Sequence, residues 1–404
     1  MSQVEPHRRV VSGMRPTGAL HLGHYHGVLK NWVRLQHEYE CFFFVADWHA
    51  LTTDYESTSG IRASSQRMLV DWLAAGVNPG SATLFVQSQV PEIAELHLLL
   101  SMITPNAWLE RVPAYKDMQE RLQERSASTY GLLGYPLLQS ADILAYRAGL
   151  VPVGADQEPH VEIAREIARR FNFLYGRDEG FEQQAEAAIR KLGKKNAALY
   201  KLLHSAHRTH GDEGALETAR ALVREQAQLT LADKERLLGY LEGLGKSILA
   251  EPRSLLTETA RMPGLDGQKM SKSGSNLIPL RAEPEDVEKR VRTMHTDPAR
   301  IRLTDPGEPE RCPVWQLHQL YSDESVRDTV QLQCRSAGWG CLECKQPVID
   351  AIIAEQAPIR ERAEQFENNP DLLKRLLSEG TEKARDEVRS TLQDVREVMG
   401  LTGI

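Results

Sequence analysis

The segment His21-Leu22-Gly23-His24 contains two histidines that are separated by two residues. It follows a turn-rich stretch, residues 12–18, so it can begin a helix whose free N–H groups face phosphate. Gly23 lets a nucleotide lie close to the backbone, and both imidazoles can donate hydrogen bonds to phosphate oxygens as charge builds. The alternative is two surface histidines beside a turn, which would be preferred if the pattern stood alone.

A second candidate, Lys269-Met270-Ser271-Lys272-Ser273, lies about 245 residues further on, in a flexible polar setting of glycine, serine and asparagine. Lys269 and Lys272 can bind the β- and γ-phosphates of a nucleotide and neutralise departing pyrophosphate. The alternative is an ordinary basic loop. Because both segments occur in one chain, a phosphate-binding pair is favoured over two coincidences.

Together with the stretches SGMRPTGALHLGHYHG, ADWHALT, VQSQVPEIAEL, YPLLQSADILAY, VPVGADQEPHVEIAREIARRFN and PGLDGQKMSKS, these motifs resemble the class I aminoacyl-tRNA synthetases. Within that class the chain is most similar to the tryptophanyl-tRNA synthetase family. The resemblance implies ATP and Mg²⁺ as cofactors, and L-tryptophan, tRNA(Trp) and a second copy of the chain as partners. It also implies a tryptophan–tRNA ligase with catalytic His21, His24, Lys269 and Lys272, which stabilise the transition state electrostatically.

A candidate amino-acid pocket lies in Tyr135–Asp142. Offsets of four and three residues place Tyr135, Gln139 and Asp142 on one face of a helix. A buried carboxylate can accept the single hydrogen of an indole N–H, although Asp142 in isolation would suggest a helix cap or an ion pair. By resemblance, Asp142 binds the indole nitrogen, Tyr135 and Gln157 contact the tryptophan ammonium or carboxylate, and His49 lies near the same pocket.

The resemblance also implies an ATP site. Arg15, Pro16 and Thr17 line it, Gly154 and Asp156 face the ribose, and the backbone near Met262 meets adenine. The remaining expected ATP-binding residues are Gly23, His24, Ala155, Lys269, Met270, Ser271, Lys272 and Ser273. Two residues depart from the family pattern: many members have Gln in place of Arg15 and Met in place of Gln139. The first change can alter phosphate contacts, and the second makes the indole pocket more polar.

Four of the five cysteines, Cys312, Cys334, Cys341 and Cys344, have the spacing C-x21-C-x6-C-x2-C. This number and type of ligand suits zinc or an iron–sulfur cluster, and the alternative is four unrelated buried thiols. A subset of the family carries a [4Fe–4S] cluster on nearly this spacing, which favours that cluster over zinc. Its expected role is structural or anticodon-facing.

In the part of the chain that must position these residues, apolar strands alternate with amphipathic helices. Strands are expected at residues 9–12, 41–46, 83–86 and 150–154, and a turn-rich loop at 13–18. The predicted fold class is α/β: a Rossmann-type doubly wound parallel sheet, a helical insertion, and an α-helical C-terminal anticodon-binding domain. The expected boundaries are 1–176 and 253–283 for the catalytic domain, 177–252 for the insertion and 284–404 for the C-terminal domain.

Bulk composition narrows the class of protein. The chain has 404 residues and a net charge of −7, which argues against coating nucleic acid non-specifically, so no DNA partner is expected. It shows no secretory signal pattern and no apolar run of about 18 residues, so a cytoplasmic protein without a membrane partner is expected.

The sequence leaves three rival functions open. Tyrosyl-tRNA synthetase shares the fold and both motifs. A small HxGH nucleotidyltransferase is disfavoured by KMSKS and by the large helical C-terminal half. A synthetase-like tRNA-binding or regulatory protein without catalysis is disfavoured by the two intact motifs.

Overall fold

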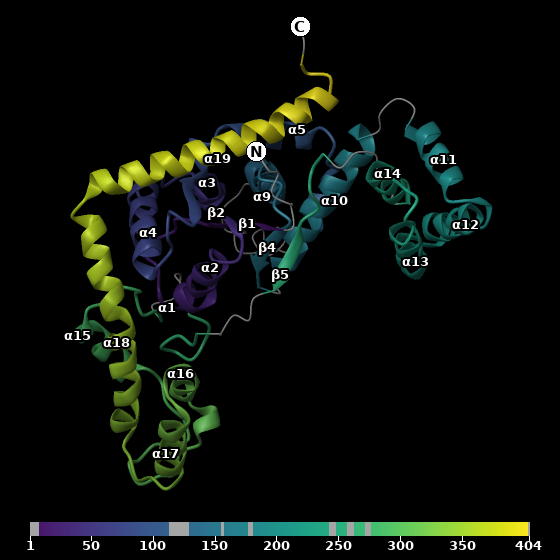
Figure 1. The fold of residues 1–404 in the computed structure, drawn as a ribbon. Helices are drawn as coiled ribbons and strands as arrows, with labels where there is room; N and C mark the ends of the chain where they lie inside the picture. The colour runs from purple at the N-terminus through teal and green to yellow at the C-terminus, as the bar shows by residue number, and fades with distance from the viewer. Residues whose placement is uncertain are drawn as a thin grey trace.

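The computed structural model describes residues 8–112, 129–154, 157–176, 181–241, 248–256, 262–270 and 276–402. Its centre is a sheet of five parallel strands in the order β3-β2-β1-β4-β5 (Figure 1). The strands are β1 (Arg9–Met14), β2 (Glu40–Val45), β3 (Ala82–Val86), β4 (Leu150–Val153) and β5 (Arg253–Leu256). Because the strand order reverses between β1 and β4, the crevice at their carboxyl ends is where such a sheet binds ligands. The predicted doubly wound parallel sheet is confirmed.

The bounds of β2, β3 and β4 differ from the expected ones by one residue at an end, and two differences are larger. β1 continues through Gly13 to Met14, two residues into the expected loop. A Cβ at Gly13 would lie 2.4 Å from the Phe44 ring, so glycine here makes room for an aromatic side chain of the neighbouring strand. β5 was not expected, because its four residues are only partly buried and show no apolar run.

Alternation of side chains gives the sheet two buried faces. Val10, Phe43 and Leu84 contribute to one hydrophobic cluster, and Phe42 and Phe85 contribute to a second cluster on the other face. Strands buried on both faces explain why β2 and β3 read as unbroken apolar runs.

The helices of the first half connect and cover the strands. They are α1 (Leu22–His24), α2 (Lys30–Leu35), α3 (Asp47–Asp54), α4 (Ile61–Ala75), α5 (Glu92–Ser101), α6 (Asn106–Glu110), α8 (Tyr130–Leu133), α9 (Tyr135–Ala145) and α10 (Glu158–Tyr175), with a π-helix η2 (Tyr25–Leu29) and a 3₁₀ turn η3 (Gln87–Gln89). The predicted helix over 135–142 is therefore present as α9. The π-helical turn directly follows His24, and such turns often mark functional segments.

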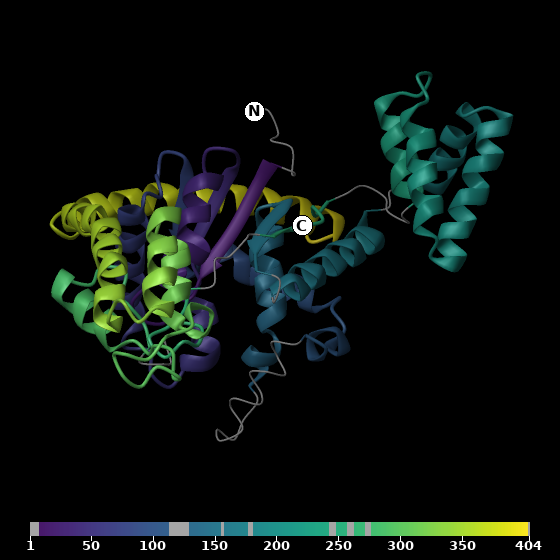
Figure 2. The same cartoon turned by 90° about the horizontal axis from the view of Figure 1, so that it is seen from below.

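Four helices after α10 form a bundle that projects from the rest of the molecule (Figure 2). They are α11 (Phe181–Lys191), α12 (Lys194–His210), α13 (Glu213–Arg224) and α14 (Leu231–Leu241). The bundle has its own hydrophobic cluster, which includes Tyr200 and Leu237. The chain before the bundle and the chain after it meet at the buried Asn172 of α10, whose side chain accepts hydrogen bonds from the backbone N–H groups of Ile248 and Leu249 at 2.9 and 3.0 Å.

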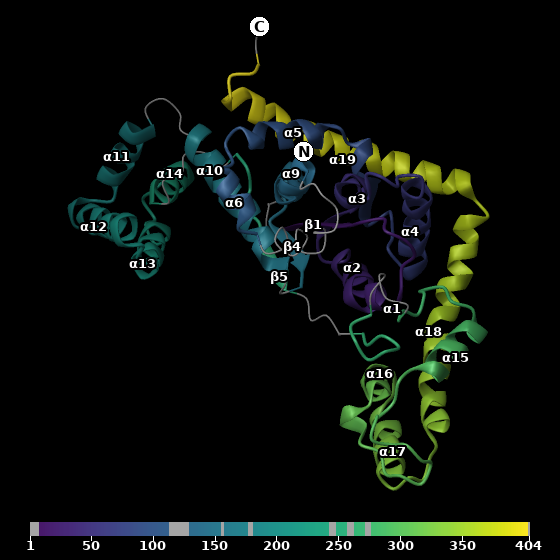
Figure 3. The same ribbon diagram turned by 180° about the vertical axis from the view of Figure 1, so that it is seen from behind.

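The C-terminal part is helical and wraps around the sheet domain (Figures 1 and 3). Its elements are α15 (Pro284–Thr293), η5 (Pro309–Arg311), α16 (Pro313–Tyr321), α17 (Glu324–Arg335), α18 (Cys341–Glu367) and α19 (Pro370–Val398). α18 packs against α4, and α19 runs along the edge strand β3. Among the described residues, none of the helices is long and apolar enough to cross a membrane.

Candidate active site

Predicted site residues follow three of the strands at the same edge of the sheet. Arg15 follows β1, His49 lies in the helix that follows β2, and Gly154 follows β4. Because all strands are parallel, these carboxyl ends converge on the crevice between β1 and β4. The Arg15 guanidinium donates to the hydroxyl of Thr53 in α3, which fixes this side chain beside the crevice.

Backbone hydrogen bonds orient the two imidazoles of the HLGH segment. His21 precedes α1, and its Nδ1 accepts a hydrogen bond from the Gly23 N–H at 3.1 Å. The Nδ1 of His24 accepts from the His21 N–H at 3.3 Å, and the ring centroids are 3.8 Å apart. In a neutral imidazole whose Nδ1 accepts, the proton resides on Nε2. The backbone thus selects the tautomer in which Nε2 can donate to a phosphate oxygen.

The two phosphate motifs meet in space despite their distance in sequence. The segment after KMSKS pairs with HLGH: the Leu22 N–H donates to Ile278 O at 3.1 Å, and Leu280 N–H donates to Leu20 O at 2.9 Å. A Cβ at Gly23 would lie 3.7 Å from the Cβ of Met270. Met270 is buried and bonds through its backbone to Met262. Met262, predicted to meet adenine, therefore anchors the start of the KMSKS segment.

Part of the predicted ATP site falls outside the described residues: Ala155, Asp156, Ser271, Lys272 and Ser273. Lys269 is described and forms an antiparallel bridge with Pro263 at the entry to the segment. Pro16 is buried and Thr17 is half-buried in the loop between β1 and α1.

Asp142 is the centre of a buried polar cluster. It is 1% exposed, and its Oδ2 lies 2.7 Å from Nε2 of His49, which is also buried. The ring of Tyr135 meets the His49 ring edge-on, with centroids 4.6 Å apart. Burial raises the pKa of the Asp142 carboxyl, while hydrogen bonds from His49 and Gln87 act in the opposite direction. The structure thus brings His49, Tyr135 and Asp142 together, as the sequence predicted.

The other two predicted pocket residues lie at the start of α10 and on α9. Gln157 precedes α10, and its backbone N–H donates to Gly154 O at 2.9 Å. Gln139 Oε1 lies 2.6 Å from Nδ1 of the buried His160, so the amide that replaces the family's methionine is bonded to a neighbouring ring. His160 was not assigned a role from sequence, and nothing in its spacing pointed to Gln139.

Gln87 is the other polar residue of the cluster that the sequence analysis missed. It is fully buried, and its Nε2 lies 2.8 and 2.9 Å from the two carboxylate oxygens of Asp142. The sequence does indicate a role for Gln87, because this residue directly follows the buried strand β3, at the edge of the sheet where ligands bind.

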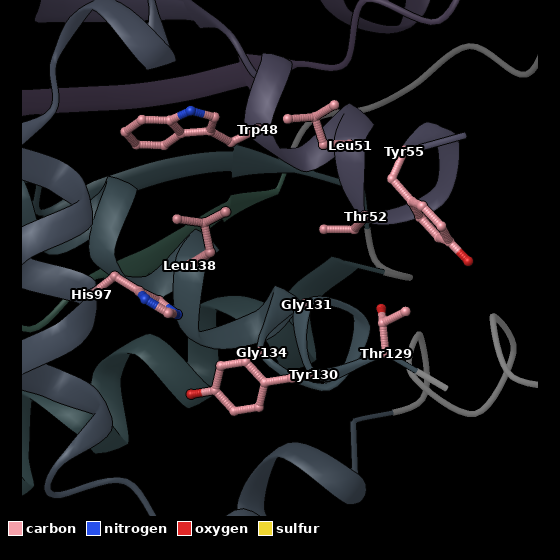
Figure 4. Close-up of a pocket in the computed structure, with 10 residues that line it drawn as sticks. All are labelled: Trp48, Leu51, Thr52, Tyr55, His97, Thr129, Tyr130, Gly131, Gly134 and Leu138. Carbon is pink, nitrogen blue, oxygen red and sulfur yellow. The ribbon is translucent and has the colours of Figure 1, made fainter. Parts of the chain in front are cut away.

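A cavity of about 380 Å³ adjoins this cluster, on the side of α3 and α9 that carries apolar residues (Figure 4). Its lining includes Trp48 and Thr52 from α3, His97 from α5, and Tyr130 and Leu138 from α8 and α9. None of the residues predicted to contact tryptophan is among them. We place the candidate active site at the buried polar cluster and the phosphate motifs, because they carry the chemistry that the cavity lacks.

The four cysteines of the C-terminal part lie near one another. Burial, together with the charges of the Cys312, Cys334 and Cys341 thiolates, raises the pKa of the Cys344 thiol to about 12. Its sulfur lies 3.6 Å from Nε2 of His318. Across the described ranges, however, no three Cys, His, Asp or Glu side chains are grouped so that they could hold a metal ion. The side chains as placed do not fit a metal centre, and the iron–sulfur prediction stays a prediction.

Comparison with known proteins gives the class to which this fold and site belong. The family described as tRNA synthetases class I (W and Y) matches residues 3–196 and 213–355. The chain belongs to this family. It is 65% identical to the tryptophan–tRNA ligase of Ralstonia nicotianae over 98% of both chains, and 39% identical to that of Thermotoga maritima over 97% of this chain and 99% of the relative.

A solved structure supports the same class. Tryptophanyl-tRNA synthetase from Campylobacter jejuni, complexed with ADP and tryptophan, is similar with a TM-score of 0.72 and 27% identity. The similarity covers 97% of this chain and all of the other. The family resemblance that was drawn from the motifs is confirmed.

Proposed function

We propose that this protein is a tryptophan–tRNA ligase, which activates L-tryptophan with ATP and transfers it to the 3′ adenosine of tRNA(Trp). The observation that carries the proposal is the buried Asp142 carboxylate beside His49 and Tyr135, since one buried acceptor suits one indole N–H. The close relatives named as tryptophan–tRNA ligases agree with this choice and favour it over tyrosine activation.

The geometry supports an in-line reaction in which the tryptophan carboxylate attacks the α-phosphate of ATP and pyrophosphate leaves. His21 and His24, with Nε2–H as donors, and Lys269 and Lys272 stabilise the charge that develops on the phosphates. No covalent enzyme intermediate is needed, because holding both substrates in register supplies much of the rate. The acyl group then passes to the tRNA.

Within the same proposal, Gly154 and Asp156 face the ribose, and Ala155 also belongs to the ATP site. Arg15 to Thr17 line the nucleotide, and the KMSKS residues hold its phosphates. Magnesium is held mainly by those phosphates, which suits its reluctance to lose water. A homodimer, tRNA(Trp) binding by the C-terminal helices and a cytoplasmic location complete the proposal, all carried over from the family.

The deciding experiment is ATP–pyrophosphate exchange with a panel of amino acids. Exchange should depend on tryptophan and be absent with tyrosine and phenylalanine. Stimulation by tyrosine instead would assign the chain to the tyrosine branch, and no exchange with any amino acid would leave a non-catalytic synthetase-like protein.

The four cysteines carry a separate proposal, a [4Fe–4S] cluster with zinc as the alternative. It is supported by the C-x2-C spacing that begins α18 and by the presence of all four cysteines in the C-terminal helical part. Such a cluster would stabilise the helical region, because no step of aminoacylation requires an electron. Protein purified anaerobically should be brown and contain iron; colourless, iron-free protein with bound zinc would select the alternative, and protein with neither metal would refute both.

A further inference from the structure

Gln87 occupies a position from which it can act on the amino-acid pocket without touching the substrate. It is the first residue after β3 and begins the η3 turn, and its side chain is fully buried. A buried amide is costly unless its donors and its acceptor are paired. The partners of this amide therefore show what the side chain does.

The orientation of the Gln87 amide is fixed by its two neighbours. Its Oε1 accepts a hydrogen bond from the Trp48 N–H at 3.1 Å, so the NH₂ group must face the opposite way. There Nε2 lies almost equally far, 2.8 and 2.9 Å, from Oδ1 and Oδ2 of Asp142. The side chain thus ties the amino end of α3, next to His49, to the carboxylate on α9.

These contacts leave one side of the Asp142 carboxylate for a ligand. An ionised carboxylate offers about four acceptor positions on its two oxygens. Gln87 covers the edge between the two oxygens, and His49 Nε2 occupies the outer position on Oδ2. Among the contacts made by the described residues, the position that remains is the outer one on Oδ1. A single remaining acceptor matches a ligand with a single N–H donor.

We propose that Gln87 is a specificity-determining positioning residue, which orients the Asp142 carboxylate so that one oxygen is presented to an indole N–H. The inference rests on the proposed function, because it takes tryptophan as the substrate. Support comes also from the buried environment: burial raises the pKa of Asp142, and the hydrogen bond from Gln87 is among the contacts that lower it. Without Gln87, Asp142 would turn or bind a proton and accept the indole N–H less well.

A purely structural role for Gln87 would have a different consequence. If the residue merely held α3 against η3, its loss would impair all amino-acid substrates in parallel. The discriminating substrate is 3-(3-benzothienyl)-alanine, in which sulfur replaces the indole N–H and the shape is nearly unchanged. A site that hydrogen-bonds the indole N–H rejects this analogue, because the Asp142 carboxylate then stays unpaired.

The test compares tryptophan with the sulfur analogue in ATP–pyrophosphate exchange by the full-length protein. Gln87→Met keeps the side-chain length but removes both donors. We expect kcat/KM for tryptophan to fall about 10- to 100-fold, the range for losing a hydrogen bond to a charged group, and kcat/KM for the analogue to change far less. The preference for tryptophan should shrink accordingly. Gln89→Met, in the same turn but exposed and bonded to Thr381, should leave both values unchanged.

Two outcomes would overturn the inference: an unchanged preference in Gln87→Met, or an equal loss for both substrates. Should that variant fold poorly, Gln87→Asn retains the amide one methylene short of Asp142 and should also lower the preference; an unaltered preference there counts equally against the role. Failure of the proposed function is recognised separately, because wild-type protein would then show no tryptophan-dependent exchange.

Discussion

At the scale of single residues, the candidate site combines histidines whose tautomers are set by backbone hydrogen bonds with positively charged lysines. The HLGH backbone accounts for the tautomer of both imidazoles, since each Nδ1 accepts a backbone N–H. The proposed role of the two KMSKS lysines requires no such control, because a flexible ammonium acts on phosphate as a point charge. The residues therefore differ in how sensitive they should be to substitution.

Lys272→Ala should slow tryptophan activation, with kcat for exchange falling about 100- to 1000-fold, because one positive charge that stabilises the developing negative charge is lost. The KM for tryptophan should change little, because the amino-acid pocket is separate from the phosphates. Steady-state exchange kinetics measure both. Lys289→Ala, an exposed lysine of α15, is the matched control, and normal kcat in Lys272→Ala would refute the assigned role.

At the scale of elements, side chains of the segment that follows HLGH contact the C-terminal helices and stabilise their packing on the sheet domain. Glu355 of α18 accepts from Lys30 at 2.7 Å and from Tyr321 at 2.8 Å, and it lies 2.9 Å from Nε2 of His26. His26 belongs to the π-helical turn directly after HLGH. The position of the HLGH segment is thus coupled to α18 and α16 through His26.

This contact predicts a pH-dependent stability. Burial would raise the pKa of Glu355, but hydrogen bonds from His26, Lys30 and Tyr321 lower it to about 2, from an ordinary value of 4.5. The Glu355 carboxyl therefore binds a proton less tightly in the folded state than in the unfolded state. The stabilisation, about 3 kcal/mol, is fully present above pH 4.5 and is lost as the pH falls toward 2.

Urea unfolding of wild type and Glu355→Gln at several pH values tests this expectation. The variant should be less stable at pH 7, and the difference in unfolding free energy should narrow once the pH falls below about 4.5. Glu361→Gln, also on α18 but exposed, should show no such trend. A difference that is independent of pH would contradict the role of the ionised carboxylate.

The approach of α19 to the edge strand gives a second prediction at this scale. A Cβ at Gly380 would lie 2.0 Å from the carbonyl oxygen of Leu84, so only glycine allows this contact. Gly380→Ala should destabilise the protein by about 1–3 kcal/mol, as overpacking does, although alanine favours helix. Urea midpoints measure it. Gly214→Ala in α13 has no such neighbour, since its nearest atom is 3.3 Å away in the Asp212 side chain; equal effects of the two substitutions would exclude the close-approach argument.

At the scale of the whole molecule, the projecting bundle α11–α14 is separable from the site. It has its own hydrophobic cluster, and Asn172 joins the chain on its two sides through Ile248 and Leu249. The catalytic sheet domain therefore does not depend on the bundle for its core.

Replacing residues 177–247 with a short Gly/Ser linker should leave tryptophan-dependent exchange close to that of the full chain, because the clamp at Asn172 remains. Exchange rate and thermal unfolding of both proteins are the measurements. The same deletion with Asn172→Ala should be clearly less stable. Loss of exchange in a folded deletion protein would show that the bundle contributes to activation.

The sequence by itself determined the reaction class and most of the sheet. HLGH, KMSKS and the pocket segment carry fixed residue types at fixed spacing, and β2 and β3 are apolar enough to be read directly. Tertiary structure alone decided the rest: β5 forms because β4 offers it a parallel neighbour, and Gln87 reaches Asp142 across 55 positions. Such contacts depend on how separate elements pack against one another. A local pattern of polar and apolar residues does not specify which residues distant in sequence will come into contact.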